Sequence, residues 1–314
     1  MNRTDALLDR FLAALSSPPR SGPRSRRPLG RDSKVPSGSR RLARRLAALS
    51  GSSAYNQYAD DPPPCDAPHQ TPRTPPSGRT TLLSKHALAV WAHGSLAGGD
   101  YQEGRSDLDL IAVLPEPITA RTVWEVAVAH ARLRTEPLAG LLHCTYLTPA
   151  TLPGSDRRHL TWAHGRLFRR TITPVTRREL HTFGRVLHGG APAELLPPVT
   201  DLELEAFVVR DQRDFWRPAV DEARLWTRDV WVDLGLTTFA RAAVTLREGR
   251  LISKGEALGE LPGLGAPADV VEDVRRRRYG MRPLFAGEEW LARRSGLTRD
   301  YLGPAIDGLV EKYS

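Results

Sequence analysis

The 314-residue sequence has very little cysteine and no long apolar run. Its two cysteines, Cys65 and Cys144, allow neither a disulfide framework nor a cysteine-rich metal site, and they fit a reducing compartment. A membrane-spanning helix needs about 20 consecutive apolar residues, and no stretch of the sequence approaches that length. The apolar stretch at the start is interrupted by Asp9 and Arg10, which argues against a secretory signal. We therefore expect a cytoplasmic protein that is not held in a membrane.

Acidic residues are scarce in the first part of the chain. Residues 1–80 hold 14 Lys and Arg but 6 Asp and Glu, a net charge of +8, whereas the rest holds 31 against 30. A nucleic-acid-binding domain would carry its positive charge on the folded part. Because the folded part is expected to be nearly neutral, no stable nucleic-acid partner is predicted.

The first 80 residues also contain 12 of the 26 prolines and many Ser, Gly and Arg. Such a composition buries too little apolar surface to offset the entropy of ordering, so residues 1–80 are predicted to form a disordered basic tail. Short helices fit at 5–15 and 40–49, and the second would be basic and amphipathic. Three interpretations stay open: a solvated tail, a transit peptide, or a segment upstream of the true start of translation.

Regular patterns begin near residue 83. Short apolar runs predict three buried strands, and apolar spacing between the second and third predicts a helix; these elements lie at 87–92, 108–114, 119–134 and 140–147. Together they predict a small α/β sheet domain over 81–155, followed by a polar connector over 156–200. Helical periodicity then predicts an all-helical domain over 201–314, with helices near 201–217, 219–247, 267–279, 286–295 and 299–312.

The strongest chemical pattern is the stretch HGSLAGGDYQEGRSDLDL at 93–110. In a strand, residues i and i+2 point to the same face, so Asp107 and Asp109 aim their carboxylates at one point. Mg²⁺ prefers carboxylate oxygens together with substrate phosphates, and nucleotidyl transfer uses such a cation to neutralise developing charge. Gly94 lets the backbone approach a phosphate, and Ser95 offers a hydroxyl and an N–H. The pattern predicts a phosphate and magnesium site.

These elements, in this order, resemble the signature of the nucleotidyltransferase superfamily of the polymerase-beta type. The resemblance rests on the apolar strand, the Gly94–Ser95 pair and the run Ser106, Asp107, Leu108 and Asp109. It implies an α+β fold, in which a small mixed-sheet nucleotidyltransferase domain precedes an all-helical C-terminal domain. It also implies that Gly94, Ser95 and Ser106 contact the nucleotide, while Asp107 and Asp109 are catalytic and bind Mg²⁺.

The helical half narrows the resemblance. Residues 234–261 and 270–280 look like the C-terminal domain of aminoglycoside adenylyltransferases of the streptomycin and spectinomycin 3''/9 type. This likeness implies ATP as the co-substrate. It further implies that Arg241 and Lys254 contact the ATP phosphates and that Tyr279 contacts the nucleotide end. Cations around a triphosphate are also what the chemistry requires.

The chain departs from that family at one position. The family usually carries a third carboxylate on the next strand, which completes the metal site and can act as the general base; here His143 takes its place. Three alternatives follow. His143 itself is the catalytic base, or another carboxylate supplies the function, or transfer is lost and the protein only binds nucleotide. The candidate carboxylates are Glu136, Asp221, Asp229 and Asp233.

Aminoglycosides are polycations, so an acceptor site for them needs acidic and aromatic side chains. Such residues gather in the segment 213–235, from which Trp226, Asp229 and Asp233 are the candidate acceptor-binding residues. Asp229 and Asp233 are one helical turn apart and therefore share a face.

The favoured hypothesis is a monomeric or dimeric enzyme of the antibiotic-resistance type. It would transfer AMP from ATP to a hydroxyl of a small-molecule acceptor, aminoglycoside-like by resemblance. One alternative is a nucleotide-binding pseudoenzyme or regulatory protein with the same fold. Another is a protein-modifying minimal nucleotidyltransferase of a toxin–antitoxin pair, against which the long helical half counts.

Overall fold

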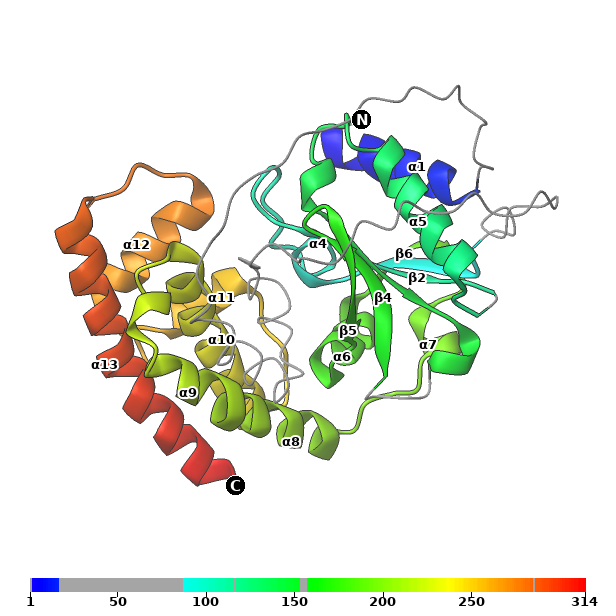
Figure 1. The fold of residues 1–314 in the computed structure, drawn as a ribbon. Coiled ribbons are helices and arrows are strands. Elements are labelled where there is room, and N and C mark those ends of the chain that lie inside the picture. Colours follow the sequence, from blue (N-terminus) through cyan, green and yellow to red (C-terminus); the bar gives the residue numbers. More distant parts are fainter. Residues whose placement is uncertain (1, 17–86, 116, 153–156, 285) are drawn as a thin grey trace.

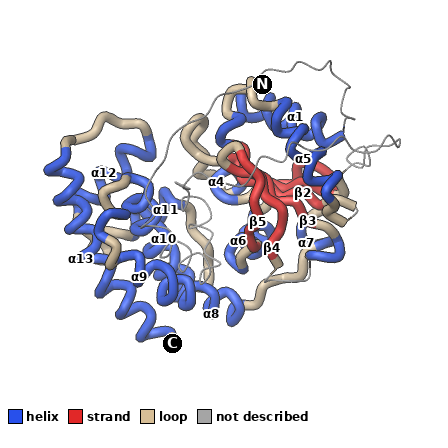
Figure 2. Tube along the Cα trace, viewed as in Figure 1, coloured by secondary structure: helices blue, strands red, loops and turns tan. Residues whose placement is uncertain are grey.

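The computed structural model describes residues 2–16, 87–115, 117–152, 157–284 and 286–314, which form a sheet domain beside a helical domain (Figure 1). Figure 2 shows the strands gathered in the first domain and only helices and loops in the second. The α+β fold is confirmed. Most of the predicted tail, including the possible helix at 40–49, lies outside the described residues. No helix among the described residues combines the length and apolar character needed to cross a bilayer.

The sheet domain is built on one mixed six-stranded sheet. Its strand order is β5-β4-β3-β2-β1-β6, and β2 and β3 are the parallel pair, whereas the other neighbours are antiparallel. A helix, α5, connects the parallel strands, as such a crossover requires. The bounds are β1 Ala89–Ala92, β2 Leu108–Val113, α5 Ala120–Arg132, β3 Leu142–Leu147, β4 Arg158–Ala163, β5 Arg166–Thr171 and β6 Arg185–Gly189.

The prediction of a connector over 156–200 is wrong. This segment supplies β4, β5 and β6, together with the helices α6 (Pro174–Phe183) and α7 (Pro192–Leu195). The strands β5 and β6 lie at the two edges of the sheet, where one side of a strand faces solvent and charged residues are tolerated. Their polar sequences, RLFRRT and RVLHG, therefore lack the continuous apolar run that revealed the central strands.

The helix predicted at 5–15 is present as α1 (Arg3–Ser16) and is part of the sheet domain. It packs against α5, with Leu7, Leu8, Phe11 and Leu15 buried in the same apolar cluster as Leu108 of β2. These residues were assigned to the disordered tail because their apolar face has no partner nearby in the sequence. In the folded protein that partner is α5, about a hundred residues further along the chain.

The helical domain differs from the prediction in where helices begin and join. The helix expected from 219 begins at 229, after a turn, and the two helices expected at the C-terminus form one continuous helix that contains Pro304. The bounds are α8 Asp201–Asp211, a π-helical turn Gln212–Trp216, α9 Arg217–Val220, α10 Asp229–Glu248, α11 Lys254–Glu260, α12 Ala268–Tyr279 and α13 Glu288–Tyr313. Short elements complete the fold: α4 Gly94–Ala97 and the 3₁₀ turns Ala139–Leu141, Pro149–Thr151 and Ala223–Leu225.

Candidate active site

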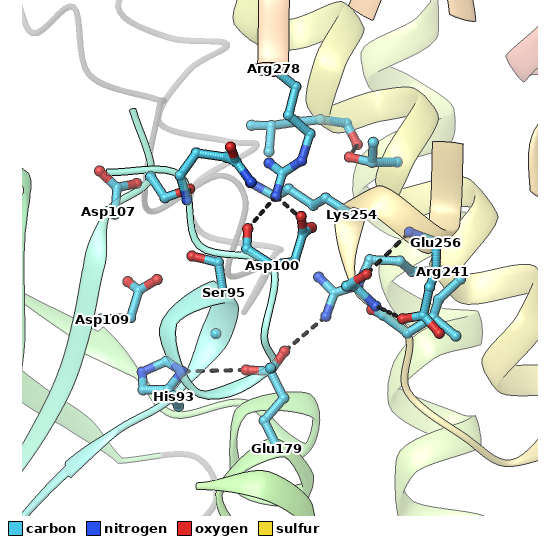
Figure 3. A pocket seen from close by; sticks show the side chains of 18 of the residues that line it. His93, Ser95, Asp100, Asp107, Asp109, Glu179, Arg241, Lys254, Glu256 and Arg278 are labelled. Carbon is cyan, nitrogen blue, oxygen red and sulfur yellow. Dashed lines mark hydrogen bonds and ion pairs between the residues drawn. The ribbon is translucent and has the colours of Figure 1, made fainter. Parts of the chain in front are cut away.

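A cavity of about 900 Å³ lies between the two domains and is lined by residues of both (Figure 3). The sheet domain contributes the Gly-Ser turn, the loop that leads to the Asp107 pair, and side chains of β5 and α6. The helical domain contributes side chains of α10, α11 and α12. The cavity therefore exists only because the two domains come together, which is a common position for small-molecule sites.

The Gly-Ser turn follows β1 and is tied to β2. The backbone N–H of His93 donates to the carbonyl of Asp109 at 3.0 Å. Gly94 has a φ of +60°, and a Cβ atom there would lie 2.9 Å from Oδ2 of Asp109. Only glycine combines this backbone conformation with such a close approach. Gly94 and Ser95 therefore line the cavity directly beside the Asp109 carboxylate.

Asp107 and Asp109 both face the cavity (Figure 3). Asp109 lies in β2, and the alternation of the strand turns its neighbours Leu108 and Leu110 into the core. Burial would raise the pKa of Asp109, but the neighbouring side chains of His143, His93 and Arg170 hold that pKa well below its usual value. The carboxylate is therefore an anion under physiological conditions, as a metal ligand must be.

The carboxylates of Asp107 and Asp109 could supply part of the coordination shell of Mg²⁺. Mg²⁺ is commonly held by one or two carboxylates plus substrate phosphates and water, and the close cradle of Asp109 against Gly94 leaves room for no larger side chain. Among the described residues, no three His, Cys, Asp or Glu side chains are grouped so that they could hold a metal ion. Asp107 and Asp109 would thus hold Mg²⁺ together with the nucleotide.

His143 lies behind the two aspartates and not in the cavity wall. Its side chain is 0% exposed, and its Nε2 and Nδ1 lie 3.7 Å from Oδ1 of Asp107 and Oδ1 of Asp109, respectively. These distances exceed hydrogen-bond length, and neither nitrogen has a hydrogen-bond partner. The ring of the exposed His164 packs against the ring of His143, with their centroids 4.5 Å apart. His143 can therefore influence a substrate only through Asp107 and Asp109.

The carboxylates considered as replacements are elsewhere or already paired. Glu136 is ion-paired with Arg10, and Asp221 with Arg217; neither lines the cavity. A further carboxylate that lines the cavity is Glu179 of α6, which the sequence analysis missed.

Glu179 connects the two domains across the floor of the cavity (Figure 3). Its carboxylate lies 3.3 Å from Nδ1 of His93 and accepts a 2.8 Å hydrogen bond from Arg241 of α10. Burial would raise the pKa of Glu179, but His93 and Arg241 outweigh it and lower the pKa below its usual value. Arg241, expected to contact ATP phosphates, lines the cavity but is held there by Glu179 and by the carbonyl of Ile252.

A second connection between the domains lies at Asp100. Its carboxylate accepts hydrogen bonds from Arg278 of α12 and from the backbone N–H of Gly255 in α11. Lys254, the first residue of α11, lines the same wall. Burial lowers the pKa of Lys254, and its charge faces Asp107 and Asp109. A cationic wall thus faces the acidic pair.

Three predicted nucleotide or acceptor residues make contacts within the protein that the sequence did not reveal, and two of them lie outside the cavity wall. Ser106 lines the cavity and also closes the loop, because its hydroxyl accepts from the N–H of Gln102 at 3.1 Å. Tyr279 is 40% exposed and lies outside the cavity wall, with its hydroxyl against Gly255. Trp226 is not an acceptor residue in this structure: it is 0% exposed in the helical core and its indole donates to the carbonyl of Ala219.

Asp229 and Asp233 do share a face of α10 and both line the cavity. Each of them is ion-paired with an arginine, however. Asp233 is ion-paired with Arg277 at 2.5 Å, and Asp229 with Arg294 at 2.7 Å.

Comparison with known proteins agrees with this arrangement at the level of the fold. The crystal structure of spectinomycin adenyltransferase AAD(9) from Enterococcus faecialis with ATP and spectinomycin matches with a TM-score of 0.55 and 15% sequence identity. The match covers 73% of this chain and 94% of that one. The chain has the fold of a nucleotidyltransferase. No protein-family model and no curated protein sequence matches it.

Several cavity residues were not among the site residues predicted from the sequence. They are Asp100, Arg170, Glu179, Arg277 and Arg278. Arg170 of β5 is buried, and its Nε donates to Oγ1 of Thr145 at 3.2 Å. Asp100 follows the Gly98–Gly99 pair directly, and an acidic residue after such a loop is the one hint that sequence reasoning could have used. The others become functional only through contacts between distant segments.

Proposed function

We propose that this protein is a magnesium-dependent adenylyltransferase that transfers AMP from ATP to a hydroxyl of a small-molecule acceptor in the cytoplasm. One observation carries the proposal. The Gly94–Ser95 turn and the Asp107 and Asp109 carboxylates face a wall of cations, Lys254 and Arg278, within a single cavity. An acidic pair opposite cations is the arrangement that a metal-bound triphosphate requires.

The residues that line the cavity have different proposed roles in the reaction. Asp107 and Asp109 would hold Mg²⁺, which would neutralise charge on the phosphates. Lys254 and Arg278 orient the triphosphate, while Glu179 keeps Arg241 in the wall. The acceptor oxygen then forms a bond to the α-phosphorus, the bond to the pyrophosphate oxygen breaks, and the hydroxyl proton passes to a cavity carboxylate or to water.

The test is release of pyrophosphate from ATP and Mg²⁺ in the presence of spectinomycin, streptomycin and related hydroxyl compounds. The expected result is release that depends on one acceptor, which gains the mass of one AMP. The Asp107→Ala and Asp109→Ala variants should abolish it. Release that persists in both variants would contradict the assignment of the metal site.

A second candidate is a nucleotide-binding protein without transfer activity. It is favoured by one observation: the usual third carboxylate is replaced by the wholly buried His143. This candidate predicts calorimetric binding of ATP without pyrophosphate release from any acceptor. A protein-modifying minimal nucleotidyltransferase is disfavoured because the helical domain supplies one wall of the cavity.

A further inference from the structure

Arg277 of α12 lines the cavity beside α10 and binds two carboxylates. Its Nη2 and Nε donate to the two oxygens of Asp233, at 2.5 and 3.4 Å, and its Nη1 donates to Asp273. The side chain is 18% exposed, so the guanidinium is largely shielded from water. Two-point pairing of this kind fixes both partners in one orientation.

A second arginine completes the cluster. Arg294 of α13 is 1% exposed and lies 2.7 Å from Asp229 and 3.1 Å from Asp273. Three carboxylates therefore share two guanidinium groups. The exposed Arg105 adds a positive charge to the cavity wall, with its Nη1 3.4 Å from the backbone carbonyl of Arg277. The acidic face of α10 is thus close to neutral where it meets the cavity.

A polycationic acceptor would have to compete with these arginines. Displacing Arg277 from Asp233 would leave a poorly hydrated guanidinium with Asp273 as its remaining hydrogen-bonded carboxylate partner, which is unfavourable. Two other carboxylates of the cavity wall are also bound by arginines, Asp100 by Arg278 and Glu179 by Arg241. The part of the wall around Asp233 therefore gives an ammonium or guanidinium group of the acceptor little to bind.

We propose that Arg277 determines acceptor specificity by neutralising Asp233, so that the acceptor is a hydroxyl compound with little or no positive charge. This inference rests on the proposed adenylyl transfer and narrows its substrate class. It sets the acceptor apart from the polycations that the sequence resemblance indicated. Arg277 acts here through Asp233 and contributes no step to the transfer itself.

The test is calorimetric binding of the polycation streptomycin to the full chain without ATP. We expect weak binding by the native protein and a Kd at least about 10-fold lower in Arg277→Gln, because a freed carboxylate can form a charge-assisted hydrogen bond. Arg277→Lys keeps the positive charge and should bind as weakly as the native protein. The double variant Asp233→Asn/Arg277→Gln should lose the gain, since the freed carboxylate is then absent.

Arg276→Gln is the matched control, because Arg276 is the neighbouring residue of α12, pairs with Glu272 and does not line the cavity. It should leave streptomycin binding unchanged. Equal Kd values for the native protein and Arg277→Gln, whether tight or too weak to measure, would overturn the proposal, provided that thermal melting shows both to be folded. Failure of AMP transfer to every acceptor would count against the proposed function. The comparison of Kd values for streptomycin would still test the role of Arg277, because it needs no transfer.

Discussion

Asp109 and His143 lie directly opposite each other on the parallel strands β2 and β3, with Oδ1 of the carboxylate 3.7 Å from Nδ1 of the imidazole. The register that sets this pair is held by the apolar pairs on either side, Leu108 with Leu142 and Leu110 with Cys144, all of them buried. A shift by one residue would turn these side chains out of the core. Whatever residue occupies position 143 therefore sits against the carboxylate pair.

The first prediction concerns the charge at that position. His143→Glu would place a third carboxylate beside Asp107 and Asp109 in a buried site, where like charges repel. Without metal, we expect the variant to melt several degrees below the native protein. Added MgCl₂ should raise the melting temperature of the variant more than that of the native protein, because a ligand that binds the folded state stabilises it.

The measurement is the melting temperature of both proteins with and without MgCl₂. His143→Gln, which adds no charge, is the control and should respond to MgCl₂ as the native protein does. An equal response of His143→Glu and native protein would show that position 143 does not reach the metal site.

The second prediction concerns Glu179 and acid stability. Its pKa in the folded protein lies below the usual value of 4.5, because His93 and Arg241 outweigh the effect of burial. A depressed pKa contributes stability above pH 4.5 that is lost as the pH falls through the folded-state value. The free energy of unfolding of Glu179→Gln should therefore be lower by about 2 kcal/mol at neutral pH and fall less steeply below pH 4.5.

Urea titrations at several pH values measure both effects. Glu205→Gln, at an exposed position on α8, is the control and should follow the native curve. Parallel curves for Glu179→Gln and the native protein would mean that the ion pair with Arg241 does not contribute to stability in solution.

The central part of the fold could be predicted from the sequence because its signals are local. Buried strands in the middle of a sheet are continuous apolar runs, and the predicted strand at 108–114 is β2, Leu108–Val113. The position of the Asp pair at the start of this strand follows from the same run. The edge strands β5 and β6 contain arginines, among them the exposed Arg169 and Arg185, that interrupt any apolar run, so the same criterion could not find these strands.

The cavity itself could be predicted only in part. Gly94, Asp107 and Lys254 belong to recognisable patterns, and the structure places all three in its wall. The roles of Glu179 and Asp100 depend on partners in the other domain, about which their own neighbours in the sequence carry no information. Trp226 was predicted to bind the acceptor but is buried in the helical core. A high density of aromatic residues in a segment does not tell which rings face the core.

The third prediction concerns the contact at Asp100. Asp100→Ala removes the partner of Arg278 and of the Gly255 N–H, so both the α11 and α12 ends of the cationic wall lose an anchor. We expect the Kd for ATP to rise about 10-fold, equivalent to about 1.4 kcal/mol, as measured by calorimetry. The control is Glu103→Ala, because Glu103 lies in the same loop but pairs with Arg3 outside the cavity. Its Kd for ATP should equal that of the native protein. An unaltered Kd in Asp100→Ala would contradict the role assigned to this contact.

The fourth prediction concerns α1 and the start of the protein. Phe11 is 0% exposed, with its ring 5.5 Å from that of His130 on α5. Phe11→Ala would leave a space in the core of the sheet domain, and large-to-small changes at such sites cost about 3–5 kcal/mol. We expect the urea midpoint to fall accordingly, whereas Asp9→Ala, on the exposed face of the same helix, should change it little. Equal midpoints for the two variants would show that α1 is not docked in solution. A large loss of stability in Phe11→Ala would mean that α1 is packed against α5 in solution and that this contact stabilises the sheet domain.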